Sequence, residues 1–146
     1  MTNQIPAELE DWVSLRAECT VGKIFERLKS GVEHDIGIRQ TAIPAEGYPK
    51  LWVERGVGSG SFKVILDGAY KDPVTAKTTI VHSVVDFTFD QHKILVHDED
   101  RKITYVATAT LCDDGKCRLS VGGQELELWQ FRKRALEGLL FNEYLP

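Results

Sequence analysis

Residues Thr78 to Leu128 read TTIVHSVVDFTFDQHKILVHDEDRKITYVATATLCDDGKCRLSVGGQELEL, and this stretch decides the fold. Apolar and polar side chains alternate over most of it, and short turn-forming segments interrupt the alternation. This pattern is typical of consecutive antiparallel strands with one buried face and one solvated face. The stretch therefore predicts a meander of four or more strands, around which the rest of the chain must pack.

The turn lengths decide which side chains share a face, because successive strand residues point to opposite sides of a sheet. Symmetric closure of the first turn pairs Phe89 with Ile94, and symmetric closure of the second pairs Val96 with Ile103. The apolar face then collects Val81, Val85, Phe87, Phe89, Ile94, Val96, Ile103, Tyr105, Ala107, Ala109 and Leu111. The polar face collects His82, Asp86, Thr88, His97, Lys102, Thr104, Thr108 and Thr110.

The turn between Cys112 and Cys117 allows two registers. A two-residue loop would place the cysteines opposite each other but would turn Leu119 and Val121 toward water. A three-residue turn with a left-handed Gly115 in a bulge returns both aliphatic residues to the apolar face. Burying such a side chain is worth about 1.5–3 kcal/mol, so we predict the bulged turn. The two cysteines then face opposite sides, which predicts neither a disulfide nor a shared metal site between them.

A helical pattern precedes the meander and can be followed to about Gln40. One unbroken helix would be roughly 50 Å long at 1.5 Å per residue, so we expect a break at Gly22, Gly31 or Gly37 and two helical pieces. A single projecting helix used for dimerisation is the alternative. The apolar stripe, which Trp12 and Phe25 widen, consists of Leu9, Val13, Ala17, Val21, Ile24, Leu28 and Val32.

Two further strands are expected at residues 51–55 and 62–66. The glycine-rich string between them, GVGSGS at 56–61, lacks the following helix of a phosphate-binding loop and is interpreted as a hairpin connection. Residues 67–77 are expected to form a polar loop.

From Trp129 onward, the spacing of the apolar residues is that of a helix. The predicted fold is α+β in a single domain (1–146): one long or two short N-terminal helices, a curved antiparallel sheet of six or seven strands, and a C-terminal helix, with the helices on one sheet face.

Composition narrows the function classes. The net charge of −4 and the pI near 5.6 argue against a nucleic-acid partner, and the basic run Arg132–Arg134 is interpreted as solvated. No apolar run approaches the roughly 20 residues that a membrane span requires. The polar, acidic N-terminus does not resemble a signal peptide. Three cysteines fit a reducing compartment better than a disulfide framework, so a cytoplasmic location is expected, with Cys19 as a buried thiol.

Asp86 and His97 are the candidate catalytic residues, because directly opposed strand residues bring their side chains close enough for an acid–base pair. His82 lies about 13 Å along the strand from Asp86, too far to complete a metal site with them. No metal and no cofactor are predicted. The tryptophans Trp12, Trp52 and Trp129 are interpreted as anchors between helices and sheet.

Three functions remain open from the sequence. The first is a non-catalytic binding or interaction module, with a protein partner or a second copy of the chain, using the threonine-rich sheet face or the long N-terminal helix. The second is a binder of a small apolar ligand, with a cavity between sheet and helices. The third is an enzyme that uses Asp86 and His97. The absence of converging catalytic groups favours the first.

Overall fold

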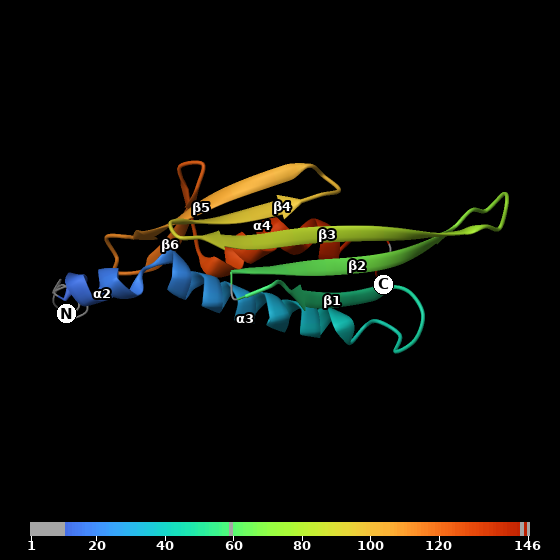
Figure 1. Ribbon diagram of the computed structural model, residues 1–146, viewed down its shortest axis with the longest axis horizontal. Helices are drawn as coiled ribbons and strands as arrows, with labels where there is room; N and C mark the ends of the chain where they lie inside the picture. The colour runs from blue at the N-terminus through green and yellow to red at the C-terminus, as the bar shows by residue number, and fades with distance from the viewer. Residues whose placement is uncertain (1–10, 59, 144, 146) are drawn as a thin grey trace, which may run out of the picture.

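A seven-stranded antiparallel sheet forms the body of the protein, as the computed structural model in Figure 1 shows. The structure describes residues 11–58, 60–143 and 145. Each strand pairs with the next one along the chain, so the sheet is an open meander. The strands are β1 (Lys50–Arg55), β2 (Ser61–Lys71), β3 (Thr78–Asp90), β4 (Lys93–Asp98), β5 (Ile103–Leu111), β6 (Cys117–Val121) and β7 (Gln124–Leu126).

Two helices, α3 (Val21–Gln40) and α4 (Leu128–Leu140), contact each other and pack on one face of this sheet. A short helix, α2 (Trp12–Glu18), precedes α3 and lies at the left end of the molecule in Figure 1. The predicted α+β class, with N-terminal helical pieces, a seven-stranded antiparallel sheet and a C-terminal helix, is confirmed.

Phenylalanine rings fill the centre of the core between the sheet and the helices. Phe62 of β2 stacks on Phe87 of β3 with ring centroids 4.7 Å apart, and Phe25 of α3 contacts Phe62 at 5.4 Å. All three side chains are almost completely buried. The three rings lie between the sheet and α3, and their stacking contributes to stability beyond the burial of area alone.

The N-terminal helix consists of two pieces as predicted, but the break lies at Cys19 and Thr20 and not at a glycine. Thr20 has an extended backbone, and its hydroxyl accepts a hydrogen bond from the backbone N–H of Lys23 at 3.3 Å. This is the arrangement of a helix N-cap. All three glycines expected to interrupt the helix lie inside α3, so the predicted position of the break was wrong.

Gly31 has a packing reason to lie within α3. A Cβ atom at this position would come within 2.7 Å of the Arg132 guanidinium, because the Arg132 side chain of α4 crosses α3 there. The Nε of Arg132 donates a hydrogen bond of 2.7 Å to the Asp35 carboxylate. The glycine therefore lets α4 approach α3 closely and brings this ion pair into register.

The helix α2 does not continue the buried stripe of α3. Within the described part of the chain, α2 buries none of its residues, so the predicted apolar stripe is not buried at Val13 and Ala17. Trp12 and Val13 are 60% and 61% exposed. Leu9, the first residue of the predicted stripe, lies outside the described residues. The residues that α3 buries are Val21, Ile24, Phe25, Leu28, Val32 and Ile36.

Two predicted turns of the meander are confirmed. Phe89 pairs with Ile94 across β3 and β4. At the β5–β6 turn, Gly115 has a φ of +83°, and Leu111 pairs with Cys117. This is the register of the bulged three-residue turn, and it turns both aliphatic residues of β6 toward the core.

The predicted β4–β5 register needs a correction. Val96 pairs with Tyr105 and not with Ile103, because the turn closes further along the chain. Lys102 adopts a φ of +54° in this turn, and Asp98 accepts a hydrogen bond of 3.2 Å from the backbone of Arg101. A shift of two residues keeps each side chain on its predicted face, so the assignment of apolar and polar faces stands.

The strand β2 continues to Lys71, five residues beyond its predicted end at Leu66. The loop expected over residues 67–77 is therefore only a short turn, in which the Asp72 carboxylate accepts a hydrogen bond of 2.8 Å from the backbone of Val74. The β2–β3 hairpin projects at the right of Figure 1. Because the side chains at its tip are exposed, the outer part of β2 lacks the apolar alternation from which a strand is recognised.

Candidate functional site

Asp86 and His97 lie directly opposite each other on β3 and β4, on the sheet face that the helices leave uncovered. Each side chain has another neighbour. The Asp86 carboxylate lies 3.8 Å from the Nζ atom of Lys63, and the Nδ1 atom of His97 is 3.0 Å from the hydroxyl of Thr104. His97 is exposed and Asp86 is partly buried. Ligand and substrate sites are typically concave, and this pair occupies an open strand surface.

A further polar contact on the uncovered sheet face also joins neighbouring strands. His82 of β3 forms an ion pair with Asp67 of β2, the residue directly opposite. Within the described residues, no group of three or more histidine, cysteine, aspartate and glutamate side chains could hold a metal ion. Such contacts between opposed side chains are typical of a solvated sheet surface.

Cys19 and Cys117 form a disulfide bond, with Cα atoms 5.4 Å apart. The prediction that Cys19 is buried is confirmed, but the prediction that it is a reduced thiol was wrong. The predicted register already turned Cys117 toward the core, on the face opposite to Cys112. Sequence alone could not reveal the partner, because the two paired residues lie 98 positions apart.

Cys112 remains a free thiol near the β5–β6 turn. Its sulfur donates a hydrogen bond of 3.1 Å to the Glu125 carboxylate. Burial raises the pKa of the Cys112 thiol, the carboxylate of Glu125 raises it further, and Arg118 opposes the rise. The nucleophilic form of cysteine is the thiolate, so this environment does not create a reactive cysteine.

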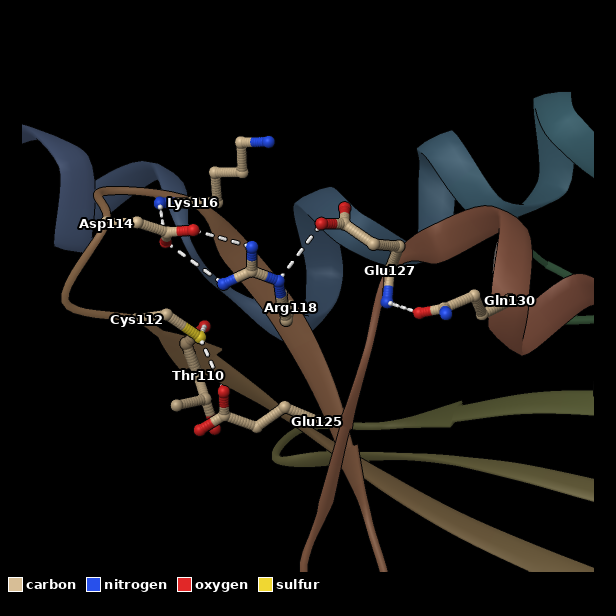
Figure 2. Close-up of polar contacts among 8 residues, drawn as sticks. All are labelled: Thr110, Cys112, Asp114, Lys116, Arg118, Glu125, Glu127 and Gln130. Carbon is tan, nitrogen blue, oxygen red and sulfur yellow. Dashed lines mark hydrogen bonds and ion pairs between the residues drawn. The ribbon is translucent and has the colours of Figure 1, made fainter.

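Arg118 is the centre of the polar cluster drawn in Figure 2. Its Nη atoms donate to both carboxylate oxygens of Asp114, at 3.0 and 2.6 Å, and its Nε atom donates to Glu127 at 3.1 Å. The bidentate bond holds the pKa of Asp114 at about 2, and it also raises the pKa of Arg118.

The same cluster fixes the beginning of α4. Glu127 is the N-cap of this helix, and its backbone N–H donates a hydrogen bond of 2.8 Å to the side chain of Gln130. The Glu127 side chain in turn accepts from the backbone of Gln130, which completes a capping box. Arg118 therefore connects the β5–β6 turn to the first turn of α4, and we assign the cluster a structural role.

A groove of about 460 Å³ lies along α3 and α4 and carries the largest exposed apolar side chains of the helical face. Ile38, Trp129 and Phe141 line it, with exposed fractions of 57%, 57% and 69%. A contiguous patch of large apolar side chains on a surface marks an interaction site far more often than scattered single residues do. This groove is the candidate binding site of the protein.

The charged residues of the groove are three cations and two carboxylates. Arg132 pairs with Asp35 at 2.7 Å, and Lys133 lies 3.7 Å from Glu137. Arg39 is the third cation that lines the groove. Among the described residues, cations thus outnumber carboxylates in the lining by three to two, in a chain whose net charge is −4.

Arg39 also organises the apolar end of the groove. Its guanidinium carbon lies 4.7 Å from the centre of the Phe141 ring, and its Nε atom donates a hydrogen bond of 2.9 Å to the backbone carbonyl of Leu140. The cation thus holds an exposed aromatic ring at the point where α4 ends. An aromatic ring beside fixed cations can accept an apolar side chain and an acidic group together.

Sequence reasoning missed this site because it treated Trp129 as an anchor in the core and the basic run beside it as solvated. Trp129 lies two residues before Phe131, and two residues on a helix turn by about 200°. Phe131 is buried against the sheet, so this spacing places Trp129 on the opposite side of α4 and could have predicted its exposure. The ion pair of Arg132 with α3 had no signal in the sequence.

No family model, no curated protein and no solved structure matches this chain. Among the described residues, the structure contains no helix whose length and apolar character would allow it to cross a membrane. The candidate site therefore rests on its own geometry.

Proposed function

We propose that this protein is a non-catalytic interaction module that binds an acidic, amphipathic helical segment in the groove along α3 and α4. The observation that carries the proposal is the convergence of Ile38, Trp129 and Phe141, each more than half exposed, in a single groove. Helical segments commonly bind by laying their apolar side chains into a groove of this kind.

The charge of the groove supports an acidic partner. In the described part of the chain, three cations, Arg39, Arg132 and Lys133, line the groove together with two carboxylates. Complementary charge favours the encounter of partners and rejects those of the wrong sign. A basic segment would meet like charge at these three cations.

The other two functions that the sequence allowed receive less support. The centre of the interior is occupied by stacked phenylalanine rings, which leaves the idea of an enclosed apolar ligand without a supporting observation. Asp86 and His97 lie on an uncovered sheet face, paired with Lys63 and Thr104. We therefore propose neither a small-molecule carrier nor an enzyme.

Two designed helical peptides test the proposal. Both have the same apolar face of leucine and tryptophan. The polar face consists of glutamate in one peptide and of lysine in the other. Isothermal titration calorimetry on dilute protein should show saturable binding of the acidic peptide and none of the basic peptide. The double variant Ile38→Ser/Phe141→Ser should lose the binding. Val106→Ser, a matched change of an exposed apolar residue on the uncovered sheet face, should retain it. Equal binding of both peptides, or undiminished binding by the groove variant, would refute the proposal.

The disulfide bond bears on where such a module would act. The expected cytoplasmic location rested in part on the odd number of cysteines, whereas disulfide bonds persist mainly in oxidising compartments. The bond between Cys19 and Cys117 favours an oxidising compartment as the site of action. Alkylation of the denatured, non-reduced protein followed by mass spectrometry should modify only Cys112; modification of all three cysteines would restore the original expectation.

A further inference from the structure

We propose that the segment bound in the groove along α3 and α4 is helix α2 of a second copy of this chain, so that two copies exchange their α2 helices. The inference rests on the proposed function, because it names the partner of the same groove. Its argument comes from α2 itself, which lies at one end of the molecule (Figure 1) and exposes apolar side chains.

The exposed surface of α2 has the character of a ligand. Trp12 and Val13 are 60% and 61% exposed, and Ala17, one helical turn after Val13, is exposed as well. Residues four positions apart lie on one face of a helix, so Val13 and Ala17 form a continuous apolar strip beside the Trp12 ring. Nothing in the described parts of the chain buries this strip.

The charge of the segment that contains α2 also fits the groove. Asp11, the N-cap of α2, is an exposed carboxylate, whereas Glu18 forms an ion pair of 2.7 Å with Lys23 of α3, and Arg16 is the one cation of α2. The sequence immediately before α2 adds Glu8 and Glu10. Carboxylates and exposed apolar side chains thus occur together in this segment, and three cations and exposed apolar side chains occur together in the groove of the same chain.

The groove cannot bind α2 of its own chain. The rise of α3 from Val21 to Ile38 is about 26 Å at 1.5 Å per residue, and α2 lies at the start of α3, away from that end. The disulfide between Cys19 and Cys117 fixes the junction of α2 and α3 to β6. Folding back along α3 would require the chain to leave this anchor, so the bound α2 must come from another molecule.

Reciprocal exchange closes the assembly as a dimer. A single contact between unlike surfaces would leave one α2 and one groove free and would extend into a filament, whereas two-fold symmetry uses both pairs. Once the first α2 is bound, the second contact forms within the same complex and benefits from the resulting effective concentration. The expected species is therefore a dimer, without larger rings or chains.

Sedimentation equilibrium tests the proposal with three variants of the full chain. The wild-type protein and the control variant Val106→Ser should sediment as dimers. The α2 variant Trp12→Ser/Val13→Ser and the groove variant Ile38→Ser/Phe141→Ser should both sediment as monomers. All the replaced side chains are substantially exposed, so circular dichroism should show the same folded spectrum for every variant.

Each other outcome overturns the proposal in a recognisable way. A wild-type monomer at several hundred micromolar would exclude the exchange. A groove variant that remains dimeric would indicate contact of α2 with α2, and an α2 variant that remains dimeric would indicate contact between two grooves.

The acidic designed peptide separates this inference from the proposed function, because it is titrated into the α2 variant, whose groove cannot be filled by Trp12 and Val13. Binding of the peptide combined with a wild-type monomer would leave the proposed function standing and refute the exchange. No binding of the peptide, combined with dimers that both double variants abolish, would support the exchange and refute a groove for foreign segments. If the peptide does not bind and the wild-type protein is a monomer, both proposals are refuted.

Discussion

The helices α2 and α3 carry one continuous apolar stripe in the sequence, yet the chain buries that stripe only in α3. Six residues of α3 pack against the sheet, with Leu28 and Val32 completely covered. The same spacing in α2 leaves Val13 more than half exposed. Periodicity therefore identifies an apolar face but does not say which surface will cover it. In α3 the cover is the sheet of the same molecule, and in α2 we propose that it is a second molecule.

The largest expected effect is a difference in stability between substitutions at equivalent positions of α3 and α2. Leu28→Ala should destabilise the folded protein by about 2–5 kcal/mol, because it opens a cavity in the core. Val13→Ala should change the stability of the monomer by less than about 0.5 kcal/mol, as is usual for surface positions. Urea unfolding at a protein concentration low enough to keep the wild type monomeric measures both. Similar losses for the two variants would show that α2 is packed in its own chain.

Removal of the disulfide should have the next largest effect. A covalent link between residues 98 positions apart restricts the unfolded chain, and such bonds are typically worth about 2–4 kcal/mol. The double variant Cys19→Ser/Cys117→Ser should lose stability by this amount in urea unfolding. Cys112→Ser is the matched control and should unfold like the wild type. An unchanged midpoint in the double variant would show that the bond does not stabilise the junction of α2 and α3.

The N-cap that separates the two helices should contribute less. Thr20→Ala removes the hydroxyl that accepts a hydrogen bond from the backbone of Lys23, and losses of this kind cost about 1 kcal/mol. Thr20→Ser keeps the hydroxyl and serves as the control. If alanine and serine at this position proved equally stable in thermal unfolding, the break between α2 and α3 would not depend on the cap.

The smallest effect concerns the cluster that holds α4, the helix that packs beside α3. The folded pKa of Asp114 is about 2, below its ordinary value of 3.8. The ionised carboxylate therefore stabilises the folded protein above about pH 4, and this contribution disappears as the pH falls toward 2. Asp114→Asn should lower the melting temperature at pH 6 and leave it close to that of the wild type at pH 2. An equal difference at both pH values would contradict the ionic role.

Much of the fold could be predicted, because strand alternation and turn chemistry are local properties. The bulged turn at Gly115 followed from the cost of exposing Leu119 and Val121, and the structure has that turn. The β4–β5 register was wrong by two residues, since a shift of two preserves both faces and leaves the apolar pattern unchanged. Apolar alternation identifies the sheet face on which a side chain lies, but it does not identify the residue opposite it on the next strand.

The candidate site could not be predicted in the same way, because it depends on contacts between distant segments. The groove combines the end of α3 with α4, and Arg132 reaches Asp35 across 97 positions of sequence. The disulfide partner of Cys19 likewise depends on where β6 lies. The helical spacing between Trp129 and Phe131 could have predicted that Trp129 is exposed, but this aromatic residue was assumed to be buried.

The most direct measurement of the central claim mixes the α2 variant Trp12→Ser/Val13→Ser with the groove variant Ile38→Ser/Phe141→Ser and records native mass spectra. Each variant alone has both exchange contacts damaged and should appear as a monomer. In the mixture, the intact α2 of the groove variant can bind the intact groove of the α2 variant, so a heterodimer with the summed mass of the two variants should appear. A mixture that contains only the two monomers, while the wild type is dimeric, would contradict the exchange of α2 between copies.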